Sequence, residues 1–393
     1  MKTKTIAILG STGSIGNSTL EVVKKSNELK VVLIFANSNY SQILLQIKIF
    51  KPKIVIIKDF KVYSKIKKIK KINKHIKILN NIINIHKHIK KIDITVSAIP
   101  GIAGLEPTLA FIKLSKKILL ANKESIVCGW DLIKKNAKKF KTKLIPIDSE
   151  HYSISELTKN YSDHEIEKIY ITASGGPFFK LDKKKFKKIK PEDAVKHPKW
   201  KMGKKISVDS ATLMNKVLEL TEAIKLFPFN SNKYQIIIHP QSLVHAIVKF
   251  KNGTTHLLYH EPDMKIPISN ALFDGKFKYT LYFKNKNKKN FSEHNLDFFP
   301  ADKKKFSTLK LIPEMSKRKS APIIINAANE IFVDEFLKKN IEFNDIGSYL
   351  NLVLKDKNYI KTSNMLANSI KSIYKIDNWA RELSYKIIKK TKI

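Results

Sequence analysis

Polar and charged side chains with helical spacing give the first indication of chemistry in this chain. Asn215 and Glu219 are four residues apart in an apolar-periodic segment, so they share one helix face, with Lys216 beside them. Ser210 lies just before this segment. A hydroxyl, an amide, an ammonium and a carboxylate on one surface suit a small anionic ligand. A helix with an N-terminal Ser cap and a solvated polar face remains the alternative.

The residues that precede this helix predict a mobile loop. Pro198 and Gly203 interrupt any regular element here, and the same stretch carries His197, Trp200 and Met202. An aromatic loop in front of polar helix residues is typical of a binding surface.

A second group of acidic side chains follows the predicted strand Leu144–Ile147. Asp148 and Glu150 are two residues apart, so in an extended chain they point to the same side. The carboxyl end of a parallel strand is where doubly wound sheets place their ligands. Two carboxylates without a nearby cysteine suit Mg²⁺ or Mn²⁺. A solvated acidic turn or a helix N-cap box is the alternative, and we expect His151 to have a supporting role.

Glycines at the start of the chain predict a cofactor site. Gly10, Gly13 and Gly16 follow the predicted strand Thr5–Leu9 and open a predicted helix, which is a variant of the dinucleotide fingerprint. A plain glycine turn between strand and helix is the alternative. The end of the second strand, residues 36–39, has neither an acidic residue for a ribose 2′-hydroxyl nor an Arg or Lys for a 2′-phosphate. The missing acid weakly favours NADP over NAD.

Two other strand ends carry candidate site residues. Ser174 is followed by two glycines, a turn that presents a hydroxyl and backbone amides to an anion such as phosphate. An ordinary strand-ending turn is equally consistent with that sequence. Lys123 follows the predicted strand Ile118–Leu120, and we assign it to the site only if the neighbouring strand ends also contribute residues.

The elements that must position these residues alternate between strand and helix in the first 150 residues. Short β-branched runs predict the strands Thr5–Leu9, Val31–Phe35, Ile54–Ile57, Ile94–Ala98, Ile118–Leu120 and Leu144–Ile147. Helical patterns such as Ser18–Ser26 and Ser41–Ile49 lie between them, which indicates an α/β domain with a doubly wound, Rossmann-like parallel sheet. In the Lys/Ile-rich segment Ser64–Lys91, helical spacing of Ile66, Ile69, Ile72 and Ile76 predicts an outer amphipathic helix before a linker. A DNA-binding helix is the less favoured alternative.

The rest of the chain predicts a central α+β domain and a C-terminal helical domain. Its predicted strands are Lys168–Ala173, Gln235–His239, Leu243–Phe250 and Thr254–Tyr259, with Asn252-Gly253 as a hairpin turn. Its predicted helical runs are Ala321–Leu337, Asp345–Leu354 and Ser363–Ile373. We therefore divide the chain into residues 1–148, 149–290 and 291–393, the last including a linker.

Composition limits the class of protein. The 393 residues carry 75 Lys and Arg against 34 Asp and Glu, a net charge of +41. Arginine occurs only at Arg318 and Arg381, whereas nucleic-acid readers depend on arginine. We therefore expect salt-sensitive adventitious binding to polyanions and no specific nucleic-acid partner. The single cysteine, Cys128, fits a reducing compartment, and no run of about twenty apolar residues predicts a membrane helix. We expect a soluble, cytoplasmic protein.

Together these segments resemble the 1-deoxy-D-xylulose 5-phosphate reductoisomerase family over nearly the whole chain. The matching segments, in the family's order, are Gly10–Gly16, Leu119–Ser125, Ile147–His151, Ala173–Phe178, His197–Glu219, His239–His245, Glu261–Pro267 and Asn326–Glu330. The resemblance implies a homodimeric oxidoreductase of three-part architecture that uses NADPH and Mn²⁺ or Mg²⁺. Its sugar phosphate substrate would be rearranged and the resulting aldehyde reduced, giving 2-C-methyl-D-erythritol 4-phosphate for isoprenoid synthesis.

The resemblance also implies roles for individual residues. The metal ligands would be Asp148, Glu150 and Glu219, with Glu150 also handling protons. Substrate contacts would come from Lys123, Ser149, Ser174, His197, Ser210, Asn215 and Lys216. Trp200 and Met202 would belong to a flap at residues 197–205. Cofactor contacts would come from Thr12, Gly13, Ser14, Ile15, Asn37, Ser38, Asn39, Asn122, Glu124 and Gly203. The family commonly has Gly-Lys where this chain has Asn37-Ser38, which puts the strictness of NADPH selection in doubt.

Two other functions compete with this interpretation. Another NAD(P)-linked dehydrogenase would share only the first domain and would leave the carboxylates and the Ser174 and His197 segments unexplained. A polyanion-binding protein would account for the charge alone.

Overall fold

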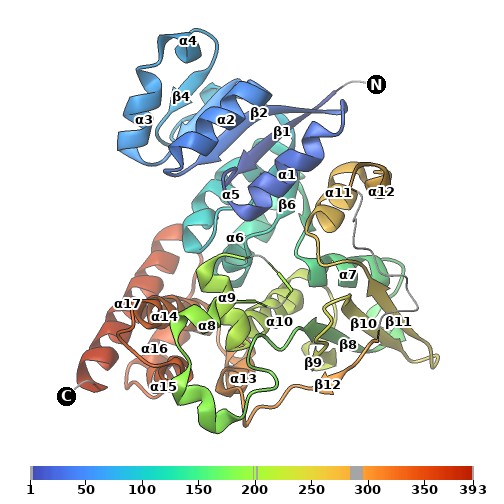
Figure 1. Cartoon of the computed structure of the whole chain (residues 1–393), viewed down its shortest axis with the longest axis vertical. Helices are drawn as coiled ribbons and strands as arrows, with labels where there is room; N and C mark the ends of the chain where they lie inside the picture. Colours follow the sequence, from blue (N-terminus) through green and yellow to red (C-terminus); the bar gives the residue numbers. More distant parts are fainter. Residues whose placement is uncertain (1–2, 198, 201, 284–294, 392–393) are drawn as a thin grey trace. The chain divides into compact units, whose positions relative to one another are not determined.

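The computed structural model describes residues 3–197, 199–200, 202–283 and 295–391. It contains two compact units (Figure 1). The first comprises residues 1–125, 131–152 and 263–287, and the second comprises residues 126–130, 153–262 and 288–393. The three-part division stays a prediction, and its boundary at residues 290 and 291 lies outside the described residues.

The first unit is built on a seven-stranded parallel sheet in the order β4-β3-β2-β1-β5-β6-β7. Its strands are β1 (Lys4–Leu9), β2 (Leu29–Ala36), β3 (Ile54–Ile57), β4 (Lys77–Leu79), β5 (Ile92–Ser97), β6 (Ser115–Leu120) and β7 (Lys143–Pro146). The sheet order reverses direction between β1 and β5, and doubly wound folds bind ligands at this kind of switch point. The predicted Rossmann-like fold is confirmed, with strand ends within three residues of those expected.

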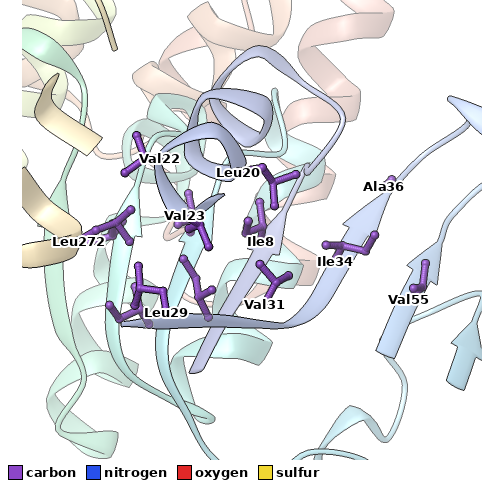
Figure 2. Packing of buried hydrophobic residues seen from close by; sticks show 14 of the residues in the cluster. Ile8, Leu20, Val22, Val23, Leu29, Val31, Ile34, Ala36, Val55 and Leu272 are labelled. Carbon is purple, nitrogen blue, oxygen red and sulfur yellow. The ribbon is translucent and has the colours of Figure 1, made fainter. Parts of the chain in front are cut away.

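The helices of the first unit follow the strand–helix alternation. They are α1 (Ser14–Lys24), α2 (Tyr40–Phe50), α3 (Phe60–Lys67), α4 (Lys70–Asn73), α5 (Leu105–Ile112), α11 (Lys265–Phe273) and α12 (Tyr279–Tyr282), together with most of α6 (Lys123–Phe140) and the start of α7 (Ser149–Thr158). Residues 126–130 of α6 and α7 from residue 153 onward belong to the second unit. Aliphatic side chains from the sheet and α1 form a continuous core, which Leu272 of α11 joins near Val22 and Val23 (Figure 2). This shared core explains why residues 263–287 belong to the first unit.

The outer helix expected at the start of Ser64–Lys91, before a linker, is wrong as one continuous helix. The chain there forms the end of α3, the one-turn helix α4 and the edge strand β4. Ile66 and Ile78 are both buried, but Ile66 lies on α3 and Ile78 lies on β4. Isoleucine recurring at helical spacing in a Lys/Ile-rich segment therefore misled the periodicity argument.

The second unit contains a mixed five-stranded sheet in the order β11-β10-β8-β9-β12. Its strands are β8 (Ile166–Ala173), β9 (Tyr234–Ile238), β10 (Val244–Phe250), β11 (Thr255–Tyr259) and β12 (Phe299–Pro300). β8 and β9 are parallel and the other neighbours are antiparallel. The predicted hairpin is confirmed, because β10 and β11 are joined at Gly253, whose φ of 89° favours glycine.

Helices make up the remainder of the second unit. They are α8 (Pro191–Ala194), α9 (Lys204–Ala211), α10 (Met214–Leu226), α13 (Ile312–Lys317), α14 (Ala321–Leu337), α15 (Phe343–Leu354), α16 (Tyr359–Ser363) and α17 (Ile370–Thr391). The expected helix Ser363–Ile373 is wrong at its centre, because α16 ends at Ser363 and α17 begins at Ile370. Among the described residues, no helix has the length and apolar character needed to cross a membrane.

One carboxylate fastens strands β1, β5 and β6 together. Asp93 accepts hydrogen bonds from the Thr5 amide and hydroxyl, each at 2.8 Å, and pairs with Lys116 at 2.7 Å. Burial by itself raises the pKa of Asp93, but the hydrogen bonds from Lys116 and Thr5 outweigh it and lower the pKa to about 2. The ionised form is therefore favoured by folding, so its contribution to stability is complete above pH ~4 and disappears as the pH falls toward 2.

We expect Asp93→Asn to lower the free energy of unfolding of the first unit by about 1–2 kcal/mol at pH 7. The measurement is urea unfolding followed by circular dichroism. Lys116→Met is the matched control, and because Lys116 is largely exposed it should cost less than about 0.5 kcal/mol. Equal stability of Asp93→Asn and the wild-type protein at pH 7 would contradict the role of this carboxylate.

Candidate functional site

The glycine turn after β1 leaves the start of α1 open to a ligand. Gly10 has a φ of 85°, and a Cβ there would overlap the backbone of Ala98. A Cβ on Gly16 would overlap the backbone of Gly10 and Ser11, so both glycines are needed for this close turn. Gly13 caps α1 with extended backbone and without a side-chain hydrogen bond, and Gly13 and Ser14 are exposed. Amides at such a helix N-terminus are suited to a phosphate group.

The turn after β2 holds the residues expected near the ribose. Asn37, Ser38 and Asn39 are exposed. Asn39 caps α2, because its side chain accepts hydrogen bonds from the Gln42 amide and the Ser41 hydroxyl, each at 3.2 Å. One of the three polar side chains is therefore already engaged in a structural cap.

Asn122 ties the ends of β5 and β6 together. Its side chain caps α6 by accepting from the Ser125 amide at 2.6 Å, and it donates to the carbonyls of Ile99 and Gly101. It also donates to Glu124 at 3.3 Å. Asn122 and Glu124 are both buried. The hydrogen bonds of Asn122 hold the loop after β5 against the start of α6.

The carboxylates after β7 lie at the start of a helix. Asp148 accepts from the Glu150 amide at 3.3 Å, and its carbonyl accepts from the Tyr152 amide at 2.8 Å, so Asp148 caps α7. Glu150 is in the first turn, so the extended geometry used to place these two side chains together is wrong. Ser149 donates to Glu150. The N-cap alternative therefore describes the backbone correctly. The half-buried carboxylates of Asp148 and Glu150 still lie close to the end of the parallel strand β7.

Two basic groups compensate the Asp148 carboxylate. Lys123 Nζ lies 3.6 Å from one oxygen, and His151 Nδ1 lies 3.2 Å from the other. Lys123 and His151 are both buried. The structure therefore brings Lys123, Asp148, Ser149 and Glu150 together in the first unit, with His151 in the supporting position expected for it.

In the second unit, the Ser174 turn meets His197. Ser174 Oγ lies 2.9 Å from His197 Nε2 and accepts from the Gly176 amide at 3.1 Å. His197 Nδ1 accepts from the backbone amides of Lys199 and Trp200 at 3.1 and 2.9 Å. Because Nδ1 accepts twice, the ring proton belongs on Nε2, which then donates to Ser174. The Ser174 hydroxyl proton remains available for a ligand.

Charge and burial keep the His197 ring neutral. Burial lowers the pKa of His197 to about 4, and the nearby Lys216 ammonium contributes in the same direction. The His197 imidazole is therefore neutral at physiological pH, and the positive charge near Ser174 and His197 comes from Lys216.

Helices α9 and α10 present the remaining polar residues. Glu219 is buried in α10 and accepts hydrogen bonds from Asn215 and Lys216, with Lys216 Nζ at 2.5 Å. Ser210 is near the end of α9, and a Cβ on Gly176 would lie 2.7 Å from the Ser210 carbonyl, so the Ser174 turn packs closely on α9. Leu213 joins the two helices with a φ of 60°, a strained conformation for a buried leucine.

The loop of residues 197–205 is partly described, and Pro198 and Lys201 lie outside the described residues. The Trp200 ring meets the buried His245 ring edge-on, with 6.1 Å between centroids, and His245 stacks on His260 at 3.8 Å. Met202 is half-buried, and Gly203 is exposed at the start of α9 with open space around it. His245 lay within the segment that carries the resemblance, but no spacing in the sequence assigns it a contact with Trp200.

Three family models match the chain. They describe 1-deoxy-D-xylulose 5-phosphate reductoisomerase at residues 6–130, its C-terminal domain at residues 144–227, and a DXP reductoisomerase C-terminal domain at residues 260–383. Curated 1-deoxy-D-xylulose 5-phosphate reductoisomerases are also similar. That of Pelagibacter ubique is 43% identical over 381 residues (96% of this chain, 97% of the relative), and that of Clostridium botulinum is 38% identical over 396 residues (96% and 98%).

Solved structures extend the similarity to the whole fold. A DOX-P reductoisomerase in complex with NADPH, fosmidomycin and magnesium matches with a TM-score of 0.91, 33% identity and 99% coverage of both chains. The Zymomonas mobilis enzyme in complex with NADPH matches with a TM-score of 0.88 and 32% identity, covering 98% of this chain and 99% of that one. With these matches spanning its length, the chain belongs to the 1-deoxy-D-xylulose 5-phosphate reductoisomerase family.

Proposed function

We propose that the protein converts 1-deoxy-D-xylulose 5-phosphate to 2-C-methyl-D-erythritol 4-phosphate, using NADPH and Mg²⁺ or Mn²⁺, in the non-mevalonate route to isoprenoid precursors. The observation that carries this proposal is membership of this family together with the carboxylates of Asp148 and Glu150, which lie where β7 ends and α7 begins. The family resemblance adds Glu219 as the third proposed metal ligand. The polyanion-binding alternative explains neither these carboxylates nor the Ser174–His197 pair.

The three carboxylates fit a hard divalent cation. They offer only oxygen ligands, and the single cysteine, Cys128, is buried and is not part of this group. When bound, the metal supplies a Lewis acid for the carbonyl and hydroxyl oxygens of the substrate, and NADPH supplies the hydride. Glu150, as both a proposed ligand and a neighbour of the substrate hydroxyls, is the carboxylate that we assign to proton handling, and it accepts a hydrogen bond from Ser149.

The substrate phosphate is assigned to the second unit. Its donors would be the Ser174 hydroxyl, held by His197 and Gly176, together with Ser210, Asn215 and Lys216. Lys123 and Ser149 would contact the sugar oxygens. Trp200 and Met202 would close over the bound substrate as a flap and exclude water, which strengthens every electrostatic interaction inside.

NADPH is assigned to the glycine turn and the ends of β2 and β6. The pyrophosphate would meet residues Thr12, Gly13, Ser14 and Ile15 at the start of α1. The adenosine ribose would lie near Asn37, Ser38 and Asn39, and the cofactor would also approach Asn122, Glu124 and Gly203. Because Asn39 already caps α2, Asn37 and Ser38 are the side chains expected to discriminate the 2′-phosphate.

We infer further that two copies associate in the cytoplasm. The family resemblance supports the homodimer, and strand β11 is an edge strand whose Leu257 side chain is 43% exposed. A single cysteine, which cannot form a disulfide within the chain, is consistent with a reducing compartment. Light scattering after gel filtration gives the oligomeric state directly.

The activity is tested by following NADPH absorbance with 1-deoxy-D-xylulose 5-phosphate, with and without Mg²⁺ or Mn²⁺. We expect NADPH oxidation that depends on both the substrate and the metal, with 2-C-methyl-D-erythritol 4-phosphate identified by mass spectrometry. Folded protein that shows no metal-dependent oxidation would disprove the proposed function.

The role of Glu219 is tested by Glu219→Gln. A neutral amide is a poor ligand for the metal, so turnover should fall by at least about 100-fold while the NADPH dissociation constant stays within about twofold. Glu222→Gln is the matched control, since Glu222 is a buried carboxylate on the next turn of α10 that does not belong to the proposed ligand group. Wild-type turnover in Glu219→Gln would show that Glu219 is not a ligand.

The charge state of His197 is tested by NMR titration of histidine-labelled, ligand-free protein, with His197→Asn to assign the signal. We expect the ring to stay neutral, protonated on Nε2, down to about pH 5, because burial and Lys216 lower its pKa to about 4. Lys216→Met should raise this pKa toward its ordinary value. A His197 signal that titrates near pH 6.5 in the wild-type protein would contradict the neutral ring.

A further inference from the structure

The Asn-Ala-Ala-Asn-Glu segment, Asn326–Glu330, has no part in the site described above, yet it lies on the buried helix α14. Asn329 Nδ2 donates to Asp209 Oδ1 at 2.8 Å, across 120 residues of sequence. Both side chains are almost completely buried, at 0% and 1% exposure. The other Asp209 oxygen pairs with Lys205 at 2.9 Å, one turn earlier on α9.

Asp209 is the immediate neighbour of Ser210. A buried carboxylate must be compensated, and here one donor comes from its own helix and the other from α14. The Asn329 hydrogen bond therefore fixes α9 against α14 at the residue next to the proposed phosphate ligand.

A second contact from the C-terminal region reaches the short connection between α9 and α10. The Thr308 hydroxyl donates to the carbonyl of Thr212, between α9 and α10. Leu213, the next residue, has the strained φ of 60° that directs the chain into α10. A strained turn persists only where its surroundings hold it, and Thr308 supplies part of that support.

We propose that Asn329, acting through Asp209, is a positioning residue that holds Ser210 in place for the substrate phosphate. The C-terminal helices thereby contribute to substrate affinity without touching the substrate. The Asn329 Oδ1 atom has no hydrogen-bond partner among the described residues, so the donor amide alone serves this function. The inference rests on the proposed function for the identity of the substrate, because the first measurement is the KM for that substrate.

The test compares Asn329→Leu with Asn326→Leu. Asn326 is also completely buried on α14, one turn earlier, but its side chain donates to Glu330 at 3.2 Å and, within the described residues, makes no hydrogen bond to α9. We expect Asn329→Leu to raise the KM for 1-deoxy-D-xylulose 5-phosphate about tenfold, with kcat changed less than about threefold and the KM for NADPH unchanged. The inhibition constant of inorganic phosphate should rise by a similar factor. Asn326→Leu should lower the melting temperature comparably and leave both phosphate readouts unchanged.

A second pair of variants keeps the test decisive if Asn329→Leu does not fold. Asp209→Asn retains an oxygen that accepts from Asn329, so its KM should stay within about threefold of wild type, whereas Asp209→Leu should reproduce the tenfold loss. An Asp209→Leu or Asn329→Leu enzyme with wild-type KM, or an equal KM increase in Asn326→Leu, would overturn the inference. Inactive wild-type protein would instead disprove the proposed function, so the two failures are distinguishable.

Discussion

The need to compensate buried charge governs this molecule. The buried Glu219 carboxylate accepts hydrogen bonds from Asn215 and Lys216. The Asp148 carboxylate lies between Lys123 and His151. A buried ion without partners costs several kcal/mol, so the protein must pair these groups internally. Each proposed metal ligand is thus held by donors that we assign to the substrate. A cation on the carboxylates would take over this compensation and release Lys123, Asn215 and Lys216 for an anionic substrate.

The same requirement explains the use of arginine. Lysine supplies nearly all of the positive charge. Of the two arginines, Arg318 directly follows α13 and Arg381 lies on α17, and the planar guanidinium of each bridges two partners. Arg381 joins Glu330 on α14 to Asp377, and Arg318 joins Glu314 to Asn364. A lysine offers a single point of charge and does not replace this fork. Arg381 fixes the end of the Asn326–Glu330 segment, the segment through which α14 reaches Asp209.

The sequence predicted those parts of the fold and site that are local. Strand cores such as Ile54–Ile57, the Asn252-Gly253 hairpin and helix Ala321–Leu337 follow from short-range periodicity and turn chemistry, and the structure confirms them. Periodicity failed in Ser64–Lys91, because lysine and isoleucine recur there too often for spacing to distinguish a helix from a strand. Asp148 and Glu150 were singled out for their chemistry, but the backbone around them is a helix start and not an extended chain. Asn329 and Asp209 meet across 120 residues, and no spacing encodes that contact.

The His197 ring shows how one uncharged group can link two functions. Its Nδ1 accepts from the amides of Lys199 and Trp200, and its Nε2 contacts Ser174. Protonation of Nδ1 would set N–H against N–H and break the contacts that hold the start of the proposed flap. Burial and the Lys216 ammonium, which lower the pKa of the ring, therefore also preserve the loop conformation. A ligand that accepts a hydrogen bond from the Ser174 hydroxyl would polarise that hydroxyl and, through it, the imidazole. The proposed phosphate contact would therefore be coupled to the position of Trp200 through a single neutral side chain.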